Sequence, residues 1–257
     1  MKLQSVELCV PDVASTAHFF ERVWGLTPVG GGKLRGTAAL PYIIGLEQGA
    51  PSIRSITFCA PRPELREERE LKGPDGETYR FVFEQPTAPL PADRDRPIQL
   101  SHVVLNSKDA DAAERFAVDQ LGFRLSDRTR IMSFVRCNRT HHCIAYARGG
   151  LSSLHHIAFE MQDLDSVMRG IGRLRDAGYP AVWGPGRHGP GNNVFGYFVG
   201  PHGGVIEYTA EVEEVGDNYK VGGPEDWKWP PGRTDHWGIG VRDNERIHAA
   251  EQAYRWS

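Results

Sequence analysis

The chain has few cysteines and lacks long apolar or basic runs. Its 257 residues include four cysteines, none of them in a C-x-x-C pair, and three lie in apolar, strand-like stretches where a reduced, buried thiol is common. No apolar run reaches about 18 residues, and no N-terminal segment has the layout of a signal peptide. With 30 Lys and Arg against 33 Asp and Glu, no nucleic-acid partner is indicated. We therefore expect a cytoplasmic protein that binds neither membrane nor nucleic acid.

One local pattern recurs along the chain. Three copies begin with strand-like runs at Val6, His102 and His156. Each continues to an Asp that can cap a helix and then, 13 to 15 residues later, to a Gly that can end it. These pairs are Asp12 and Gly25, Asp109 and Gly122, and Asp163 and Gly178. A further, weaker copy, which would be the second module in chain order, is expected at residues 52–84, with a short helix near residues 64–71.

Short strand-like runs follow each helical stretch, which completes a strand-helix-strand-strand-strand unit. The sequence thus predicts an α+β fold of four βαβββ modules paired into two domains, each an open, barrel-like cup flanked by helices. Residues 1–90 would form the first domain and residues 98–210 the second, with the proline-rich residues 87–96 as linker. Residues 211–257 leave the repeat and are expected to form a tail packed on the domains.

Two histidines occupy equivalent places in this repeat. His102 and His156 each lie seven residues before the helix-capping Asp of their module, and Glu207 lies in the last strand of the fourth module. A single such histidine is more often a structural core residue. Two equivalent histidines and a strand carboxylate instead predict a two-histidine, one-carboxylate site for non-haem iron(II) or manganese(II). Because side chains alternate along a strand, His155 is expected to face away from this site.

The second half of the chain resembles a known family. Residues 186–208 contain His188, Tyr197 nine residues later, the Pro-x-Gly turn 201–203, and Glu207 ten residues after the tyrosine. Residues 134–142 end in His142, 14 residues before His156. This order of motifs resembles the type I extradiol ring-cleaving dioxygenases of the vicinal oxygen chelate superfamily, over about residues 1–210. Gly200 departs from the family pattern, which usually has Asp, Asn or Thr there.

The resemblance implies a role for each motif residue. His102, His156 and Glu207 would bind Fe(II), or less often Mn(II). His142 would be the acid–base residue, and His188 and Tyr197 would hydrogen-bond the bound substrate oxygen. The implied reaction opens the ring of a catechol-type substrate with O2, beside its two hydroxyls, in a homo-oligomeric enzyme. Ser5 and Arg80 stand where the first domain would need a histidine and a glutamate, so that domain is expected to lack a metal.

Two other functions fit the same fold. A glyoxalase-type isomerase or lyase would use more carboxylates and often shares ligands between domains, whereas a non-catalytic binding module needs neither metal nor a His142 equivalent. The tail contains four tryptophans, Trp227, Trp229, Trp237 and Trp256. Cover for a domain face or a subunit contact is the favoured interpretation of the tail, with a lid at residues 235–237 as the alternative. His236 and His248 are not expected to be ligands.

Overall fold

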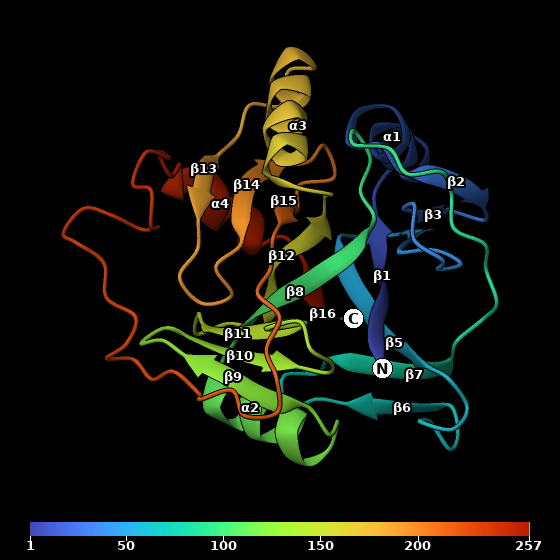
Figure 1. The fold of residues 1–257 in the computed structure, drawn as a ribbon. Helices are drawn as coiled ribbons and strands as arrows, with labels where there is room; N and C mark the ends of the chain where they lie inside the picture. The colour runs from blue at the N-terminus through green and yellow to red at the C-terminus, as the bar shows by residue number, and fades with distance from the viewer. Residues whose placement is uncertain (257) are drawn as a thin grey trace.

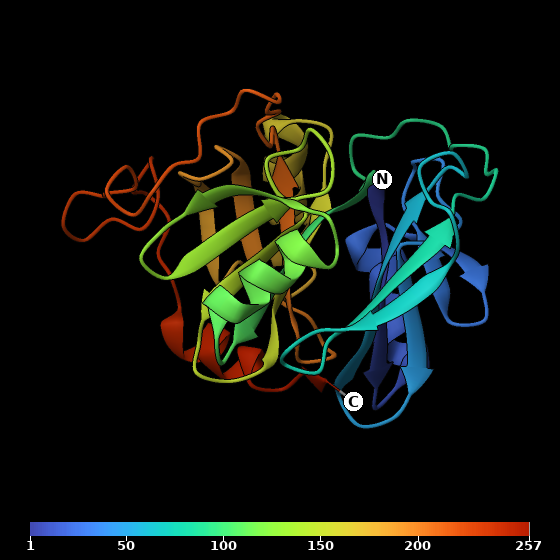
Figure 2. The same ribbon diagram turned by 90° about the horizontal axis from the view of Figure 1, so that it is seen from below.

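The computed structural model describes residues 1–256 and has the α+β architecture that the repeat predicts. A curved sheet of 16 strands runs through the molecule, with the helices outside it (Figure 1). Seen from below, strands of the first half gather on one side and those of the second half on the other (Figure 2). No helix among these residues is both long and apolar enough to cross a membrane.

The first module has all its expected elements. They are β1 (Lys2–Val10), α1 (Val13–Phe19), the π-helical turn η1 (Phe20–Trp24), β2 (Thr27–Gly30), β3 (Lys33–Arg35) and β4 (Ile44–Gln48). The second module is reduced to β5 (Ser52–Ala60), β6 (Arg69–Lys72) and β7 (Thr78–Phe83). Between β7 and the next strand there is no helix or strand, where the linker was expected.

The prediction of a helix near residues 64–71 is wrong. Turns and the short strand β6 occupy this stretch, and β6 pairs antiparallel with β7. The charged stretch offers no apolar stripe that a helix could bury, whereas strand pairing satisfies its backbone. The guanidinium groups of Arg62 and Arg69 lie over the rings of Phe83 and Phe81. The charges thus cover aromatic rings of β7 instead of forming a helix face.

The third and fourth modules are complete. The third contains β8 (Gln99–Ser107), α2 (Ala110–Asp119), β9 (Arg124–Arg128), β10 (Met132–Arg136) and β11 (Ile144–Arg148). The fourth contains β12 (Ser153–Glu160), α3 (Leu164–Asp176), β13 (Trp183–Arg187), β14 (Val194–Val199) and β15 (Val205–Ala210). The tail adds α4 (Asn244–Glu251) and β16 (Arg255–Trp256), neither of which the sequence predicts. β16 pairs with both β5 and β12 and so joins the two halves of the sheet.

Equivalent residues start and end the three module helices, as predicted. The carboxylates of Asp12, Asp109 and Asp163 each accept a hydrogen bond from the backbone N–H three residues later. Gly25, Gly122 and Gly178 have φ values of 95°, 75° and 88°, a conformation that favours glycine. The repeat therefore fixes where each helix begins and which strand follows it.

Strand register makes the two halves comparable residue by residue. On β12, Ala158 lies opposite both His102 of β8 and Glu207 of β15. On β5, Thr57 lies opposite both Ser5 of β1 and Arg80 of β7. Ser5 and Arg80 therefore occupy the places of His102 and Glu207, as the alignment of the modules predicted. Ser5 donates to the buried carboxylate of Glu7 at 3.2 Å.

Candidate metal centre and its surroundings

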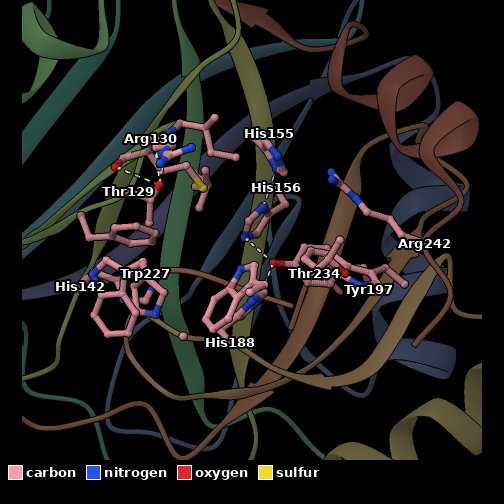
Figure 3. A pocket seen from close by; sticks show the side chains of 18 of the residues that line it. Thr129, Arg130, His142, His155, His156, His188, Tyr197, Trp227, Thr234 and Arg242 are labelled. Atoms are coloured by element: carbon pink, nitrogen blue, oxygen red, sulfur yellow. Dashed lines mark hydrogen bonds between the residues drawn. The ribbon is translucent and has the colours of Figure 1, made fainter. Parts of the chain in front are cut away.

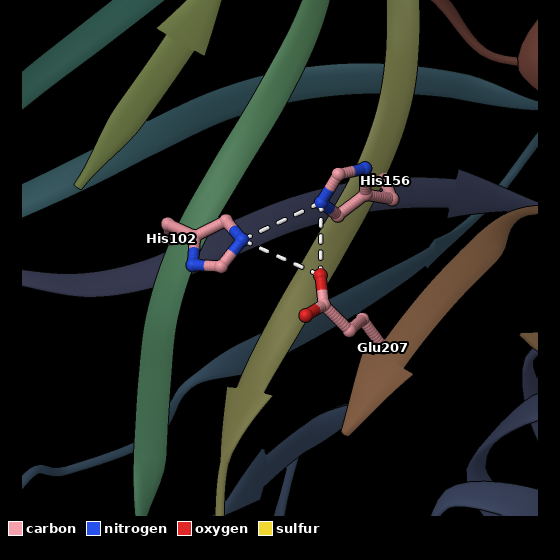
Figure 4. A group of neighbouring side chains, drawn as sticks. All are labelled: His102, His156 and Glu207. Carbon is pink, nitrogen blue, oxygen red and sulfur yellow. Dashed lines mark hydrogen bonds and ion pairs between the residues drawn. The ribbon is translucent and has the colours of Figure 1, made fainter. Parts of the chain in front are cut away.

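Three neighbouring strands bring His102, His156 and Glu207 together. The side chains converge from β8, β12 and β15 (Figure 4), and their ligand atoms all lie within 4.8 Å of one another. Glu207 Oε2 is 3.0 Å from His156 Nε2 and 3.4 Å from His102 Nε2. Within residues 1–256 this is the only such group of three His, Cys, Asp or Glu side chains. The three residues that the sequence predicted as metal ligands thus form one compact cluster.

The cluster carries the donor set and charge that a divalent cation needs. Glu207 is fully buried, yet neither of its carboxylate oxygens has a well-formed hydrogen bond within the described residues. Burial alone would raise the pKa of Glu207, but the adjacent His102 and His156 hold that pKa well below its usual range. Burial lowers the pKa of His156 to about 3. An anionic carboxylate and a neutral imidazole are the ligand forms that bind a metal, so these residues fit a cation.

His142, His188 and Tyr197 lie around the cluster and line one cavity with His102 and His156 (Figure 3). The rings of His142 and His102 are 4.3 Å apart between centroids. The Tyr197 hydroxyl is 3.1 Å from His188 Nε2 and 3.4 Å from His156 Nε2. The cavity has a volume of about 360 Å³. The three residues that the motif resemblance implied thus share one space beside the His-His-Glu cluster.

Burial governs the protonation of these groups. It holds the pKa of His142 well below its usual value, and repulsion from His102 adds to the effect. Burial likewise lowers the pKa of His188 to about 4. It also raises the pKa of Tyr197, and the Glu207 charge raises it further. At neutral pH the cavity therefore presents neutral imidazoles that can accept protons and a phenol that can donate a hydrogen bond.

The expectation that His155 faces away from the site is wrong. A bulge shifts the β8–β12 register between Leu154 and His156 and breaks the simple alternation of side chains. His155 lines the cavity, with its Nδ1 2.7 Å from His156 Nδ1 and its Nε2 3.0 Å from the Glu251 carboxylate on α4. His155 therefore links the tail to the back of the His156 ring. A doubled histidine was the sequence signal for this contact.

The tail contributes to the cavity as well as packing. Trp227, Trp229, Arg233 and Thr234 form part of the lining. The favoured interpretation as a cover for a domain face or subunit contact was therefore incomplete, and the lining residues precede the 235–237 segment that was considered as a lid. His236 lies against Trp229, with ring centroids 5.0 Å apart, and His248 of α4 forms a hydrogen bond with Gln252, just after that helix. The tail thus forms one wall of the candidate site.

Comparison with known proteins places this geometry in a family. Residues 99–208 match the Glyoxalase/Bleomycin resistance protein/Dioxygenase superfamily model. A solved structure described as the Mn(II)-bound glyoxalase from Novosphingobium aromaticivorans is 31% identical, with a TM-score of 0.85 over 95% of this chain and 93% of that one. The chain belongs to this superfamily. The matched residues include the three ligand candidates and His142.

Several curated members of the superfamily are named as dioxygenases. Metapyrocatechase 2 of Cupriavidus necator is 32% identical over 174 residues, 66% of this chain and 50% of that protein. An iron-dependent extradiol dioxygenase of Rhodococcus jostii is 30% identical over 134 residues, 46% of this chain and 45% of that protein. The chain spans about half the length of these curated relatives. Superfamily members similar to this chain thus include both dioxygenases and a protein described as a glyoxalase.

Proposed function

We propose that this protein is an extradiol dioxygenase. It would open the ring of a catechol-type substrate next to the vicinal hydroxyls and incorporate both atoms of O2, with Fe(II) held by His102, His156 and Glu207. The observation that carries the proposal is the buried His-His-Glu cluster opening on a cavity with His142, His188 and Tyr197. The named dioxygenases among its relatives support the same reaction.

The donor set decides what the metal can do. Two imidazoles and one carboxylate favour Fe(II) or Mn(II) over Mg²⁺ or Ca²⁺, and three protein ligands leave coordination positions for substrate and O2. A bound metal would supply Lewis-acid activation of the catechol hydroxyls and a path for electrons to O2. The Mn(II) bound to the Novosphingobium protein makes manganese a specific second candidate for the metal.

The cavity suits an aromatic anion. Its lining includes the rings of Phe134, Trp183, Trp227 and Trp229, which can pack against a substrate ring. Arg130, Arg233 and Arg242 also belong to the lining, while no Asp or Glu does among the described residues. This balance of charge favours a catechol that has lost a hydroxyl proton.

We propose that His142 transfers protons and that His188 and Tyr197 bind a substrate oxygen. His142 is neutral and lies beside His102, so it can take a proton from a substrate hydroxyl and return it to the opening ring. His188 and the Tyr197 hydroxyl form a hydrogen-bonded pair next to His156. Together they can hydrogen-bond a substrate oxygen in this cavity.

A metal-dependent isomerase or lyase is the second candidate. The similarity to the Mn(II)-bound glyoxalase favours it. The cluster, however, contains a single carboxylate, and the equivalent positions in the first half are Ser5 and Arg80. This composition favours the dioxygenase over a glyoxalase-type site that uses more carboxylates.

Oxygen consumption by metal-loaded protein separates the candidates. The purified chain is loaded anaerobically with Fe(II) or Mn(II), metal content is measured, and O2 uptake is followed with catechol and with 2,3-dihydroxybiphenyl. A dioxygenase consumes O2 and forms a yellow ring-opened product. The hemithioacetal of methylglyoxal and glutathione tests for isomerase activity in parallel. Metal-loaded protein that consumes no O2 with either catechol would contradict the proposal, and isomerisation of the hemithioacetal would favour the second candidate.

We propose that residues 1–90 and 98–210 are two domains, because each half has its own set of paired strands. We propose that residues 211–257 are a tail, because β16 pairs with one strand of each half and α4 packs on β12, β14 and β15. The four free cysteines favour a cytoplasmic location. Exposed Ile239 and Val241 supply apolar surface for a homo-oligomer, which light scattering on the purified chain would test.

A further inference from the structure

A buried carboxylate and a histidine stand directly behind His142. His141 Nδ1 is 3.1 Å from His142 Nδ1, and His141 Nε2 is 2.9 Å from Asp127 Oδ2. The side chains of Asp127 and His141 have no solvent exposure. Neither residue lines the cavity or belongs to the His-His-Glu cluster. Burying a carboxylate and an imidazole costs desolvation free energy, so a fully buried Asp–His pair at this position suggests a functional role.

The tail fixes the orientation of the Asp127 carboxylate. Gly222 N donates to Oδ1 at 2.6 Å, and the Tyr219 hydroxyl donates to the same carboxylate at 3.2–3.3 Å. Arg128 N also donates to Gly222 O at 2.9 Å, which holds this part of the tail along β9. With Oδ1 committed to a backbone N–H, Oδ2 is left to accept a hydrogen bond from His141.

These contacts determine where the imidazole protons lie. A carboxylate can only accept, so His141 Nε2 carries the proton that it donates to Asp127. In neutral His141, Nδ1 is then an acceptor, and the short contact to His142 requires His142 Nδ1 to donate. Within the described residues, His142 makes no other hydrogen bond. Its Nε2 is therefore unprotonated and available as a base.

We propose that Asp127 and His141 are positioning residues that hold His142 in the Nδ1–H tautomer, with Nε2 free to accept a proton from the substrate. The proposal rests on the proposed function for its catalytic consequence, but the tautomer itself does not depend on the reaction. When His142 takes a proton, its Nδ1–H still donates to His141, which still donates to Asp127. The chain of hydrogen bonds thus stabilises the imidazolium without changing its partners.

His155 and Glu251 provide a parallel in the same cavity. Their contacts assign Nε2–H to His155 and Nδ1–H to His156, which leaves His156 Nε2 unprotonated toward the cluster. A carboxylate behind a metal-bound histidine commonly sets its tautomer in this way, directly or through another group. The Asp127–His141 pair has the same arrangement but ends at a histidine outside the cluster. The shared geometry indicates that both Asp/Glu–His pairs orient the Nε2 atom of the next histidine, His142 in one case and His156 in the other.

The Asp127→Asn substitution tests this directly. Gly222 N requires an acceptor, so the amide oxygen stays on that side and the amide NH2 faces His141. His141 must then accept at Nε2, carry its proton on Nδ1, and force His142 into the Nε2–H tautomer. Imidazole ¹⁵N shifts of metal-free protein report the tautomer, with His142→Gln used for assignment. We expect Nδ1–H for His142 in the natural chain and Nε2–H in the variant. An Nε2–H tautomer in the natural chain, or no change in the variant, overturns the proposal.

Kinetics distinguish a positioning role of Asp127 from a purely structural role in holding the tail. Asp127→Asn keeps the hydrogen bonds to Gly222 and Tyr219, whereas Asp127→Ala loses them, so a structural tie makes Ala the worse variant in every assay. Positioning instead makes Asn at least as harmful to kcat as Ala, with about 100-fold loss, while metal content and substrate affinity stay near those of the natural chain. A switched tautomer with unchanged kcat also overturns the proposal.

Two controls complete the test. Tyr219→Phe removes one donor to Asp127 without inverting the acceptor that His141 needs, so the His142 tautomer should not change. Tyr79→Phe removes the buried hydroxyl contact to Tyr146 at 3.0 Å in a remote part of the core, and shows how stability loss alone affects turnover. Absence of O2 uptake in the natural chain would reject the proposed function, while the ¹⁵N shifts would still decide the positioning.

Discussion

Trp24 and Tyr208 stack at 3.8 Å between ring centroids, and the Tyr208 hydroxyl donates to the Trp24 carbonyl. Trp24 ends the first module helix, whereas Tyr208 follows Glu207 on β15. Arg173 of α3 also donates to the Tyr208 hydroxyl at 2.9 Å. A contact between the two halves of the molecule therefore lies one residue from a ligand candidate.

Tyr208→Phe should destabilise the protein by about 1–3 kcal/mol, because it leaves the buried Trp24 carbonyl and the Arg173 guanidinium without this partner. The stack itself is retained. Urea unfolding at neutral pH measures the change, and Tyr179→Phe, at a half-buried tyrosine that packs against Phe19, is the control. An unchanged midpoint would show that water replaces the hydroxyl at no cost.

Glu207→Gln should reduce retained Fe(II) by about 100-fold or more, since the amide removes the cluster's only negative charge. His142→Gln should keep the metal and lower kcat, because His142 is outside the cluster. Metal analysis after desalting, with activity per bound metal, checks both. Equal metal content in the two variants would contradict the assigned ligand set.

Glu251→Ala should weaken metal binding by about 10- to 100-fold, as loss of an outer partner of a ligating histidine commonly does. His155 would lose the acceptor at 3.0 Å that sets its proton on Nε2. Competition with a chelator gives the affinity, and Gln252→Ala, at the exposed neighbour on the tail, is the matched control. The assigned role of Glu251 fails if both variants bind metal like the natural chain.

Stability should fall as pH rises because of Glu77. Burial raises the pKa of this carboxyl to about 7, above its usual 4.5. A raised pKa favours the protonated form in the fold, so this contribution is complete below the usual value and is lost as pH rises through about 7. Glu77→Gln should therefore stabilise the protein at pH 8 by about 3 kcal/mol and have little effect at pH 4. Denaturant melts at the two pH values measure it; equal effects at both would exclude this titration.

Trp229→Ala should raise KM more for 2,3-dihydroxybiphenyl than for catechol, because it removes an aromatic wall of the cavity. For the two-ring substrate, we expect kcat/KM to fall by an amount equivalent to about 1–2 kcal/mol of transition-state stabilisation. Trp256→Ala, at a tail tryptophan that is absent from the lining, is the comparison. Equal changes for both substrates would place Trp229 outside the substrate contact.

Sequence patterns located the fold and cluster where local rules repeat. Asp caps and Gly ends fixed the three helices, and equal distance from the cap placed His102 and His156 on matching strands. The missing helix of the second module was a failure of the same reasoning, because the repeat was extended where no apolar stripe supports it. Local propensity and periodicity therefore succeed only where the burial pattern agrees with them.

What sequence could not supply depended on long-range contacts. The bulge that turns His155 toward the cavity has no signature in strand alternation. Asp127 lies on β9, 14 residues before His141, and Glu251 lies in the tail, so only the folded structure shows that they stand behind His141 and His155. The tail's contribution to the cavity likewise follows from tertiary packing, which tryptophan content alone did not reveal.

The tail is held on both sides of its cavity-lining part. Gly222 is fixed to Asp127 and Arg128, and His236 N and Asp243 N donate to Arg187 O and Val182 O. Trp227 and Trp229 thus lie on a tether with two fixed ends, which Figure 1 shows looping away from the sheet. Because both ends of this segment are fixed, it can open the cavity only by moving outward as a loop. Substrate passage would then depend on the length of chain between the two fixed ends, so shortening residues 223–235 should slow ligand entry and exit together.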